Sequence, residues 1–281
     1  MTMDIEEFKG SLRRNYKAVM ARAYVRVIGV NRELSWLAFD VFLPLFSVAA
    51  FVFVYLSSPI VQNADALVVR VIIGGAMTAF WVNILWGMGA NFYFEKETGN
   101  LEMYMAAPIS RMSILLGMAV GGMFNTTIRA LATIFLGAFI FGVAFTVTSP
   151  VALILVFVLT MIALYGLGML FASLFLLYGR EAYHTTNLLE EPIYFLSGFY
   201  YPVKFLGFYV SLAASILPIT LGLDAMNQIL APGAQWGLLP VELEILLLLV
   251  LSIFFFLAAR WSLDRMERIG KRNGRLTLRW L

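Results

Sequence analysis

The sequence predicts an all-α protein that crosses a membrane several times. Of its 281 residues, 61% are hydrophobic and only 13% are charged, whereas soluble domains are about 45–50% apolar and about 25% charged. The mean hydropathy is +0.85. Long apolar stretches alternate with short polar ones, as expected for helices that each need about 20 apolar residues to cross a bilayer. We therefore expect six transmembrane helices, preceded by an amphipathic helix and followed by a basic tail.

Residues 1–33 predict an amphipathic helix on the cytoplasmic side. This region is too charged for a signal peptide, which needs an apolar core. A basic helix with an aromatic and aliphatic face suits the surface of an anionic lipid leaflet. Basic helices also bind nucleic acid, but this one leads directly into an apolar stretch, so we expect membrane lipid and no nucleic acid. Its apolar residues recur at spacings of three and four: Ile5, Phe8, Leu12, Tyr16, Val19, Ala23, Val27 and Val30.

The transmembrane region is expected to extend over residues 34–261, with a basic cytoplasmic tail at 262–281. In the third apolar stretch, which is too long for one simple crossing, Gly117 and Gly121 form a small-xxx-small pair that favours close helix packing within the same bundle. Only about ten uninterrupted apolar residues follow Pro192, so the fifth span must begin before Glu190. The predicted spans are 36–56, 67–94, the later part of 112–147, 151–178, a fifth span that begins before Glu190 and leads into 193–203, and 241–261.

Positive charge predicts the side on which each loop lies. Seven Lys and Arg residues fall within residues 1–33 and seven within residues 260–281. The positive-inside rule places both ends in the cytoplasm, so the number of spans must be even. The expected inner loops contain Lys96, Arg111 and Arg180, which places 17 of the 20 basic residues on the inside. The chain is thus expected to be a multi-pass protein of the cytoplasmic membrane.

A polar loop at residues 95–111 lies between the second and third apolar stretches and predicts a short helix. Thr98 or Asn100 can cap the start of this helix, and Pro108 is expected to end it. An ordinary capped loop helix has the same signature, so the loop alone indicates no function.

The residues of this loop resemble the first cytoplasmic loop of ABC-2-type permeases, the membrane subunits of ABC transporters. The resemblance rests on acidic residues, Gly-Asn-Leu-Glu at 99–102, a short apolar helix, and Ala-Pro-Ile-Ser-Arg at 107–111. It implies a coupling helix that sits in a cleft of an ATPase, and an interface helix at residues 1–33 that touches the ATPase. The implied coupling residues are Gly99, Leu101, Glu102, Met103, Tyr104, Met105, Pro108 and Arg111.

A second region supports the same resemblance. Ser-Gly followed by aromatics and proline at 197–202 is similar to the outer end of the fifth helix in that family, and Leu-Pro-Ile-Thr at 217–220 and Asp-Ala-Met at 224–226 continue the match. The resemblance implies that residues 202–230 form a re-entrant helical element on the outside of a transport path. Phe199, Tyr200 and Tyr201 would then lie at the path or its gate, although an interfacial aromatic belt explains them equally well.

Three charged residues within the apolar regions are further candidates. A charge at membrane depth is costly and normally faces protein or water rather than lipid. Glu190 and Glu191 are expected to face a central cavity as a gate or substrate contact, or to lie at a wetted helix end. Arg129 either lines the path, pairs with a carbonyl or extends toward the interface; its distance along the helix argues against pairing with Glu190 or Glu191. Asp40 lies near the interface and indicates no special role.

The missing motifs limit the chemistry of this chain. It contains no Gly-x-x-x-x-Gly-Lys-Ser/Thr phosphate loop, no cysteine and one histidine, so we expect no nucleotide site, catalytic residue, metal site or cofactor. The resemblance implies that a separate ATPase subunit binds ATP and Mg²⁺, and that a second copy or a sister permease completes the path. The expected function is export of a hydrophobic or amphipathic, drug-like or lipid-like substrate.

Two other classes of function remain open. An ion-gradient-driven transporter or channel would use Glu190, Glu191 and Arg129 as a relay, although no convincing inverted repeat is visible. A membrane-embedded enzyme is a weaker alternative, because the single histidine argues against a metalloenzyme.

Overall fold

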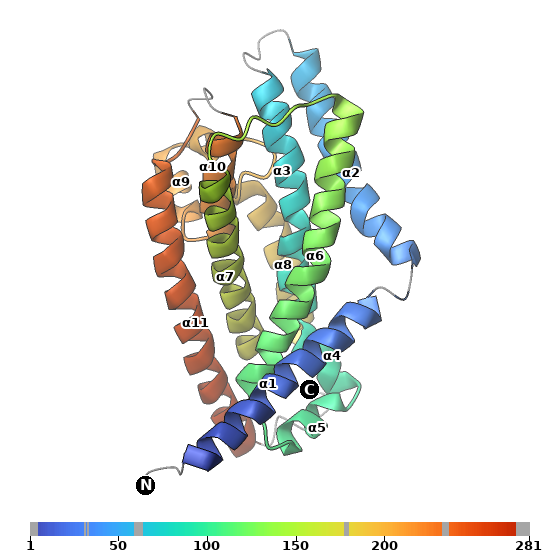
Figure 1. Cartoon of the computed structure of the whole chain (residues 1–281), viewed down its shortest axis with the longest axis vertical. Helices are drawn as coiled ribbons and strands as arrows, with labels where there is room; N and C mark the ends of the chain where they lie inside the picture. Colours follow the sequence, from blue (N-terminus) through green and yellow to red (C-terminus); the bar gives the residue numbers. More distant parts are fainter. Residues whose placement is uncertain are drawn as a thin grey trace.

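The computed structural model describes residues 5–30, 32, 34–58, 64–176, 180–231 and 236–273, and every regular element in these ranges is a helix. Most of the long helices run along the long axis of the molecule, and α1 crosses them obliquely at one end (Figure 1). The elements are α1 (Ile5–Val30), α2 (Leu34–Ser57), α3 (Ala64–Val82), the π-helix η1 (Asn83–Gly89), α4 (Asn91–Glu97), α5 (Asn100–Ala106), α6 (Arg111–Phe141), α7 (Pro150–Phe175), α8 (Arg180–Leu196), the 3₁₀ turn η2 (Val203–Leu206), α9 (Phe208–Ala214), α10 (Pro218–Leu230) and α11 (Val241–Arg272).

Five helical segments of the described chain are long and apolar enough to cross a membrane, which makes this a multi-pass membrane protein. They are Ala38–Ser57, the continuous run Ala64–Glu97, α6, α7 and α11. The pair α9 and α10 would supply a sixth span if counted as one, but the two helices are bent by 108°. The fifth predicted span corresponds to α8, which has only 17 residues and ends at Leu196. Six spans with both ends on one side therefore stays a prediction.

The core of the molecule surrounds α3, α7 and α10. Nearly every residue of α10 is buried, because this helix packs against α3, α7 and α11 rather than facing the surroundings. Thr160 of α7 packs directly on Gly222 and leaves no space for a side chain there. Trp81 and Phe80 of α3 are also fully buried. The region after α8 thus folds back into the bundle as short helices.

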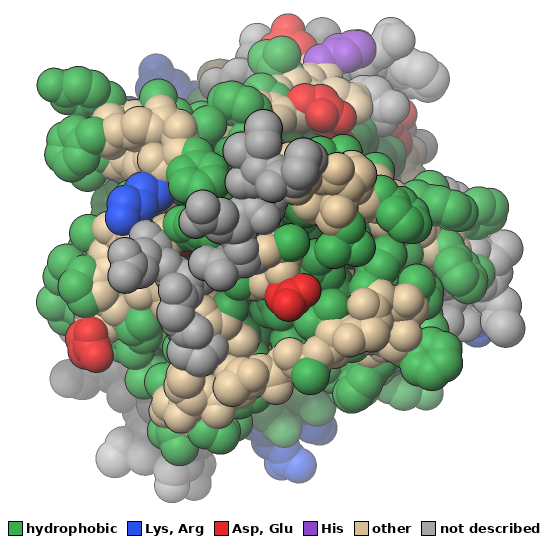
Figure 2. Space-filling view, turned by 90° about the horizontal axis from the view of Figure 1, so that it is seen from above, with side chains coloured by type: hydrophobic (Ala, Val, Ile, Leu, Met, Phe, Trp, Pro, Cys, Tyr) green, Lys and Arg blue, Asp and Glu red, His purple; other side chains and the backbone are tan. Residues whose placement is uncertain are grey.

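The outer helices instead present large apolar side chains at their surface. Phe46 of α2 and Phe135 of α6 are each 71% exposed, and Phe139 of α6 is 87% exposed. Seen from above, hydrophobic side chains also cover much of the described surface up to its rim, and charged side chains are few (Figure 2). Such a surface is suited to contact with lipid or with another apolar protein surface.

The N-terminal helix α1 packs along α6 through two glycines. A Cβ atom at Gly117 would lie 2.7 Å from the carbonyl oxygen of Val19, and one at Gly121 would lie 2.8 Å from that of Ala23. The small-xxx-small pair therefore serves packing within this chain, as the sequence predicts. The predicted apolar face of α1 is divided: Ala23 is buried against α6, whereas Leu12 is 61% exposed.

The loop helix α5 is present, but its start differs from the prediction. Its N-cap is Gly99, whose positive φ of 80° favours glycine, and no side chain caps the helix. The Thr98 hydroxyl donates instead to the carbonyl of Phe94 in α4, so capping by Thr98 or Asn100 was wrong. The end of the helix is as expected, because Ala107 before Pro108 is extended.

The last helix continues beyond the predicted boundary of the span. α11 extends through Arg272, so the first part of the basic tail is helical. Residues 1–4 of the predicted interface helix and 274–281 of the predicted tail lie outside the described residues.

Candidate functional site

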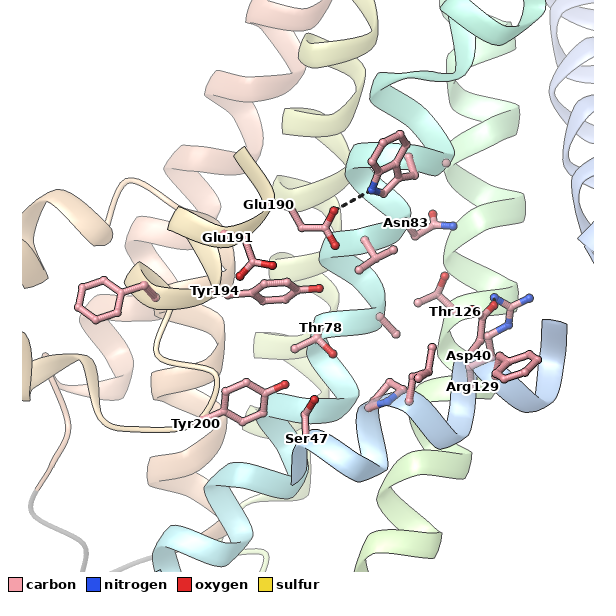
Figure 3. Close-up of a pocket in the computed structure, with 18 of the residues that line it drawn as sticks. Asp40, Ser47, Thr78, Asn83, Thr126, Arg129, Glu190, Glu191, Tyr194 and Tyr200 are labelled. Carbon is pink, nitrogen blue, oxygen red and sulfur yellow. Dashed lines mark hydrogen bonds and ion pairs between the residues drawn. The ribbon is translucent and has the colours of Figure 1, made fainter. Parts of the chain in front are cut away.

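A cavity of about 810 Å³ opens between α2, α3, η1, α6 and α8. Figure 3 shows polar side chains that reach it from both sides, with Glu190 and Glu191 on α8 facing Arg129 and Asp40 across the cavity. Its volume lies in the range of about 300–1,000 Å³ that is typical of small-molecule sites. Helices far apart in the sequence thus combine into one concave site.

The π-helix η1 forms part of the cavity wall and is a feature that the sequence analysis missed. Asn83 and Trp86 of η1 line the cavity. The Tyr165 hydroxyl donates to Asn83 Oδ1 at 3.1 Å, and Trp86 Nε1 donates to Glu190 Oε2 at 2.9 Å. π-helical turns within α-helices often occur at functional sites because the extra residue redirects side chains.

Arg129 lines the cavity and forms an ion pair with Asp40 of α2. The Arg129 side chain is 12% exposed and that of Asp40 is 35% exposed. The structure therefore gives Asp40 a specific contact that the sequence did not indicate. This pair places a charge-balanced bridge between α2 and α6 on one side of the cavity.

The two glutamates lie on the opposite wall of the cavity. Glu190 accepts from Trp86 and interacts with Tyr194 one turn later, while Glu191 is exposed. Neither carboxylate forms an ion pair with a described Lys or Arg side chain. The expectation that Arg129 does not pair with them therefore agrees with the geometry, although all three residues line the same cavity.

The three aromatic candidates that follow α8 are separated by the fold. Tyr200 and Tyr201 line the cavity, whereas Phe199 is fully buried and is not part of its lining. The ring of Tyr200 stacks on Phe51 with a centroid distance of 4.4 Å, and its carbonyl accepts from the Tyr55 hydroxyl at 2.8 Å. These contacts attach the chain after α8 to α2.

The short helix α5 lies at the end of the molecule that carries α1 (Figure 1), and it has one buried and one exposed face. Leu101 is 1% exposed and belongs to the core, and Met105 packs against that core. Met103 is 64% exposed, and Glu102 and Pro108 are exposed as well. α5 is therefore anchored from inside and has a free surface outside.

Arg22 connects this short helix to α1 and α4, and the sequence analysis did not single it out. Its guanidinium donates to the Tyr104 hydroxyl at 2.9 Å and to Asn91 Oδ1 at 3.1 Å, and it forms an ion pair with Glu95. Burial is the main cause that raises the pKa of Tyr104, so this phenol stays neutral near pH 7. The Ser110 amide also donates to Asn15 Oδ1 of α1 at 2.8 Å.

Arg111, the last residue of the predicted coupling set, connects the loop to α11. Its guanidinium lies 3.2 Å from Glu267 Oε1 and donates to the carbonyl of Met105 at 3.3 Å. The end of α5 is therefore held to the start of α6 and to the far end of α11.

A second polar cluster, near the opposite end, fixes α10 inside the bundle. Arg70 Nη2 lies 2.8 Å from Asp224 Oδ1, and both side chains are almost completely buried. Asp224 Oδ2 accepts from the Leu238 amide at 2.6 Å and from Gln228 Nε2 at 3.1 Å. Gln228 also donates to Glu244 of α11 at 3.2 Å. The cluster joins α3, α10 and α11. Among the described residues, no group of three or more His, Cys, Asp or Glu side chains could hold a metal ion.

The spanning helices and the cavity between them define a multi-pass membrane protein with a concave site lined by polar and aromatic side chains. The family model for ABC-2 type transporters matches residues 14–231 of the chain. The chain therefore belongs to the ABC-2 type transporter family, as its loop and fifth-span motifs predict. A search of curated proteins found no significant match.

Proposed function

We propose that this chain is the membrane subunit of an ATP-driven exporter that moves a hydrophobic or amphipathic substrate and is powered by a separate ATPase. The observation that carries this proposal is the two-sided helix α5, with Leu101 in the core and Met103 exposed. A helix with this arrangement can bind a partner through its outer face and pass a displacement to the bundle through its inner face.

The polar contacts of α5 supply a route for that displacement. Arg22 joins Tyr104 of α5 to Glu95 of α4 and to α1, and α1 in turn packs tightly on α6 through Gly117 and Gly121. α4 continues through η1 into α3. A push on α5 would therefore move α6 and the α3–η1 segment, both of which line the cavity.

The cavity is the proposed substrate path, and a second permease copy or a sister permease is proposed to complete it. The cavity lies against α2 and α6. Only 22% and 28% of the apolar segments of these two helices are buried within the chain. By linkage, ATP can change access to the cavity only if it binds to two conformations of the transporter complex with different affinity.

The exposed apolar face of α1, with Tyr16 64% and Tyr24 67% exposed, would lie on the cytoplasmic leaflet.

Cysteine crosslinking tests the ATPase contact. The chain has no cysteine, so Met103→Cys introduces a single reactive thiol on the exposed face of α5. In native membranes this variant is expected to crosslink to an ATPase subunit, whereas Thr185→Cys, an exposed position on α8, serves as the comparison. Absence of any ATPase from both the crosslinked product and the affinity-purified complex would contradict the proposal.

An ion-gradient-driven transporter is the second candidate, because Arg129, Glu190 and Glu191 line one cavity. Proteoliposomes that contain only the purified chain distinguish the two functions. Uptake driven by a proton or sodium gradient without ATPase would favour the second candidate. Transport that requires both the ATPase and ATP would favour the first.

A further inference from the structure

We propose that the cavity binds an amphipathic cation, whose positive group contacts Glu190 and Glu191 and whose apolar part contacts the surrounding aromatic rings. This inference rests on the proposed function, because it specifies the class of substrate that the permease would carry. The distribution of charged and aromatic side chains over the cavity walls carries it.

The charged side chains that α8 contributes to the cavity are both acidic. Glu190 and Glu191 form no ion pair with a described basic residue, and both line the cavity. The hydrogen bond from Trp86 Nε1 fixes one oxygen of Glu190 without neutralising its charge. A cation at this wall would contact two carboxylates, and its interaction with Glu190, which is only partly exposed, would be stronger than the same interaction in water.

Two positive groups also line the cavity, and neither forms an ion pair with Glu190 or Glu191. The charge of Arg129 is already balanced by Asp40, although its Nε and Nη2 atoms have no described partner. Arg26 also lines the cavity and forms no ion pair with a described carboxylate; one of its Nη atoms lies against Gly87, and its Nε atom is buried without a described partner. In Figure 3 the Arg129–Asp40 pair lies across the cavity from Glu190 and Glu191, so it does not neutralise them by contact.

Aromatic rings surround the same two carboxylates. Trp86, Tyr194 and Phe195 line the cavity beside Glu190 and Glu191, and Figure 3 shows the Tyr194 ring next to Glu191. Aromatic faces attract cations, most strongly where water is excluded. Carboxylates combined with aromatic rings favour an organic cation with an apolar body over a small hydrated metal ion, which would need a denser set of oxygen ligands.

Two ions of the same size and opposite charge provide the test. The purified full-length chain, in phosphatidylcholine nanodiscs, is titrated with tetraphenylphosphonium and separately with tetraphenylborate, and equilibrium binding is measured. We expect the chain to bind tetraphenylphosphonium, and Glu190→Gln/Glu191→Gln to weaken that binding at least about tenfold. Binding of tetraphenylborate should not weaken in this variant.

Matched variants separate a lost site from a misfolded protein. Glu181→Gln removes the same charge from an exposed position of α8 outside the cavity, and it should leave tetraphenylphosphonium affinity unchanged. Glu191→Gln alone, at an exposed side chain, covers the case in which the double variant fails to fold, and it should still weaken binding severalfold. Equal tetraphenylphosphonium affinity in the wild type and in folded Glu191→Gln, or tighter binding of tetraphenylborate through Arg129, would overturn the proposal.

The outcome is independent of the energy source. Binding is measured without ATP or ATPase, so loss of the cation site with ATP-driven transport intact would remove only this inference. Retained, glutamate-dependent cation binding in a chain that has no ATPase partner would remove the proposed function and leave the site.

Discussion

At the scale of single residues, burial separates two kinds of ion pair in this protein. The Arg70 and Asp224 side chains are 4% and 1% exposed, whereas those of Arg111 and Glu267 are 26% and 14% exposed. A buried charge that loses its partner cannot be solvated, so removal of one member is costly. A more exposed pair is screened by water and contributes little. The first pair should therefore matter for folding and the second much less.

This difference gives a stability prediction. Asp224→Asn should lower the free energy of unfolding by about 3–5 kcal/mol, because it leaves Arg70 buried without its partner. Arg111→Gln should lower it by no more than about 1 kcal/mol. Thermal unfolding of both variants in the same detergent measures the difference. Equal effects would show that burial does not decide the contribution of these pairs.

At the scale of helices, the contact between α1 and α6 depends on the absence of side chains at Gly117 and Gly121. Gly117→Ala would place a Cβ atom 2.7 Å from Val19 O, so α1 must shift, and we expect a destabilisation of about 1–3 kcal/mol. Gly29→Ala is the control on α1, because nothing lies within 4 Å of a Cβ there. Unfolding of both variants and protease cleavage of α1 provide the measurements. Unchanged stability and cleavage in Gly117→Ala would contradict the close contact.

The link from α5 to α1 gives a functional prediction at the same scale. Arg22→Gln removes the ion pair with Glu95, so ATP-driven transport by the reconstituted complex should fall at least about tenfold, a loss of roughly 1.4 kcal/mol in coupling. Assembly with the ATPase should persist, because the exposed face of α5 is unchanged. Lys17→Gln, an exposed position on the same helix, should transport normally. Full transport by Arg22→Gln would exclude this link from the route.

The sequence was most informative where one local pattern decided the structure. Apolar length predicted α7 and α11, and the loop motif with Pro108 predicted α5, because these features depend on residues close together in the chain. The π-helix η1 and the Arg129–Asp40 pair were not predictable, because both depend on packing between distant segments. The division of the apolar face of α1 was not predicted for the same reason, because it depends on how α1 packs against the distant helix α6.

At the scale of the whole molecule, burial is uneven among the spanning helices. The apolar segment of Ala64–Glu97 is 83% buried within the chain, whereas the apolar segments of α2 and α11 are each only 22% buried. One span therefore forms the centre of the chain, and the others surround it with large apolar surfaces that need lipid or another subunit. The cavity lies between this central span and the poorly buried helices α2 and α6, so whatever covers those helices also shapes the site.

The number of crossings is the property of the whole molecule that most needs a measurement. Because the chain has no cysteine, single cysteines at Lys17, Glu102, Lys204 and Lys271, labelled with a membrane-impermeant maleimide, report the side of each position. Six spans predict that Lys17→Cys, Glu102→Cys and Lys271→Cys react only from the cytoplasmic side, and Lys204→Cys only from outside. Five spans would place Lys17 and Lys271 on opposite sides. α8 is the least certain crossing, because its 17 residues are near the lower limit of about 17–25 for a transmembrane helix. Labelling of Lys204→Cys from the cytoplasm would show that α8 does not cross.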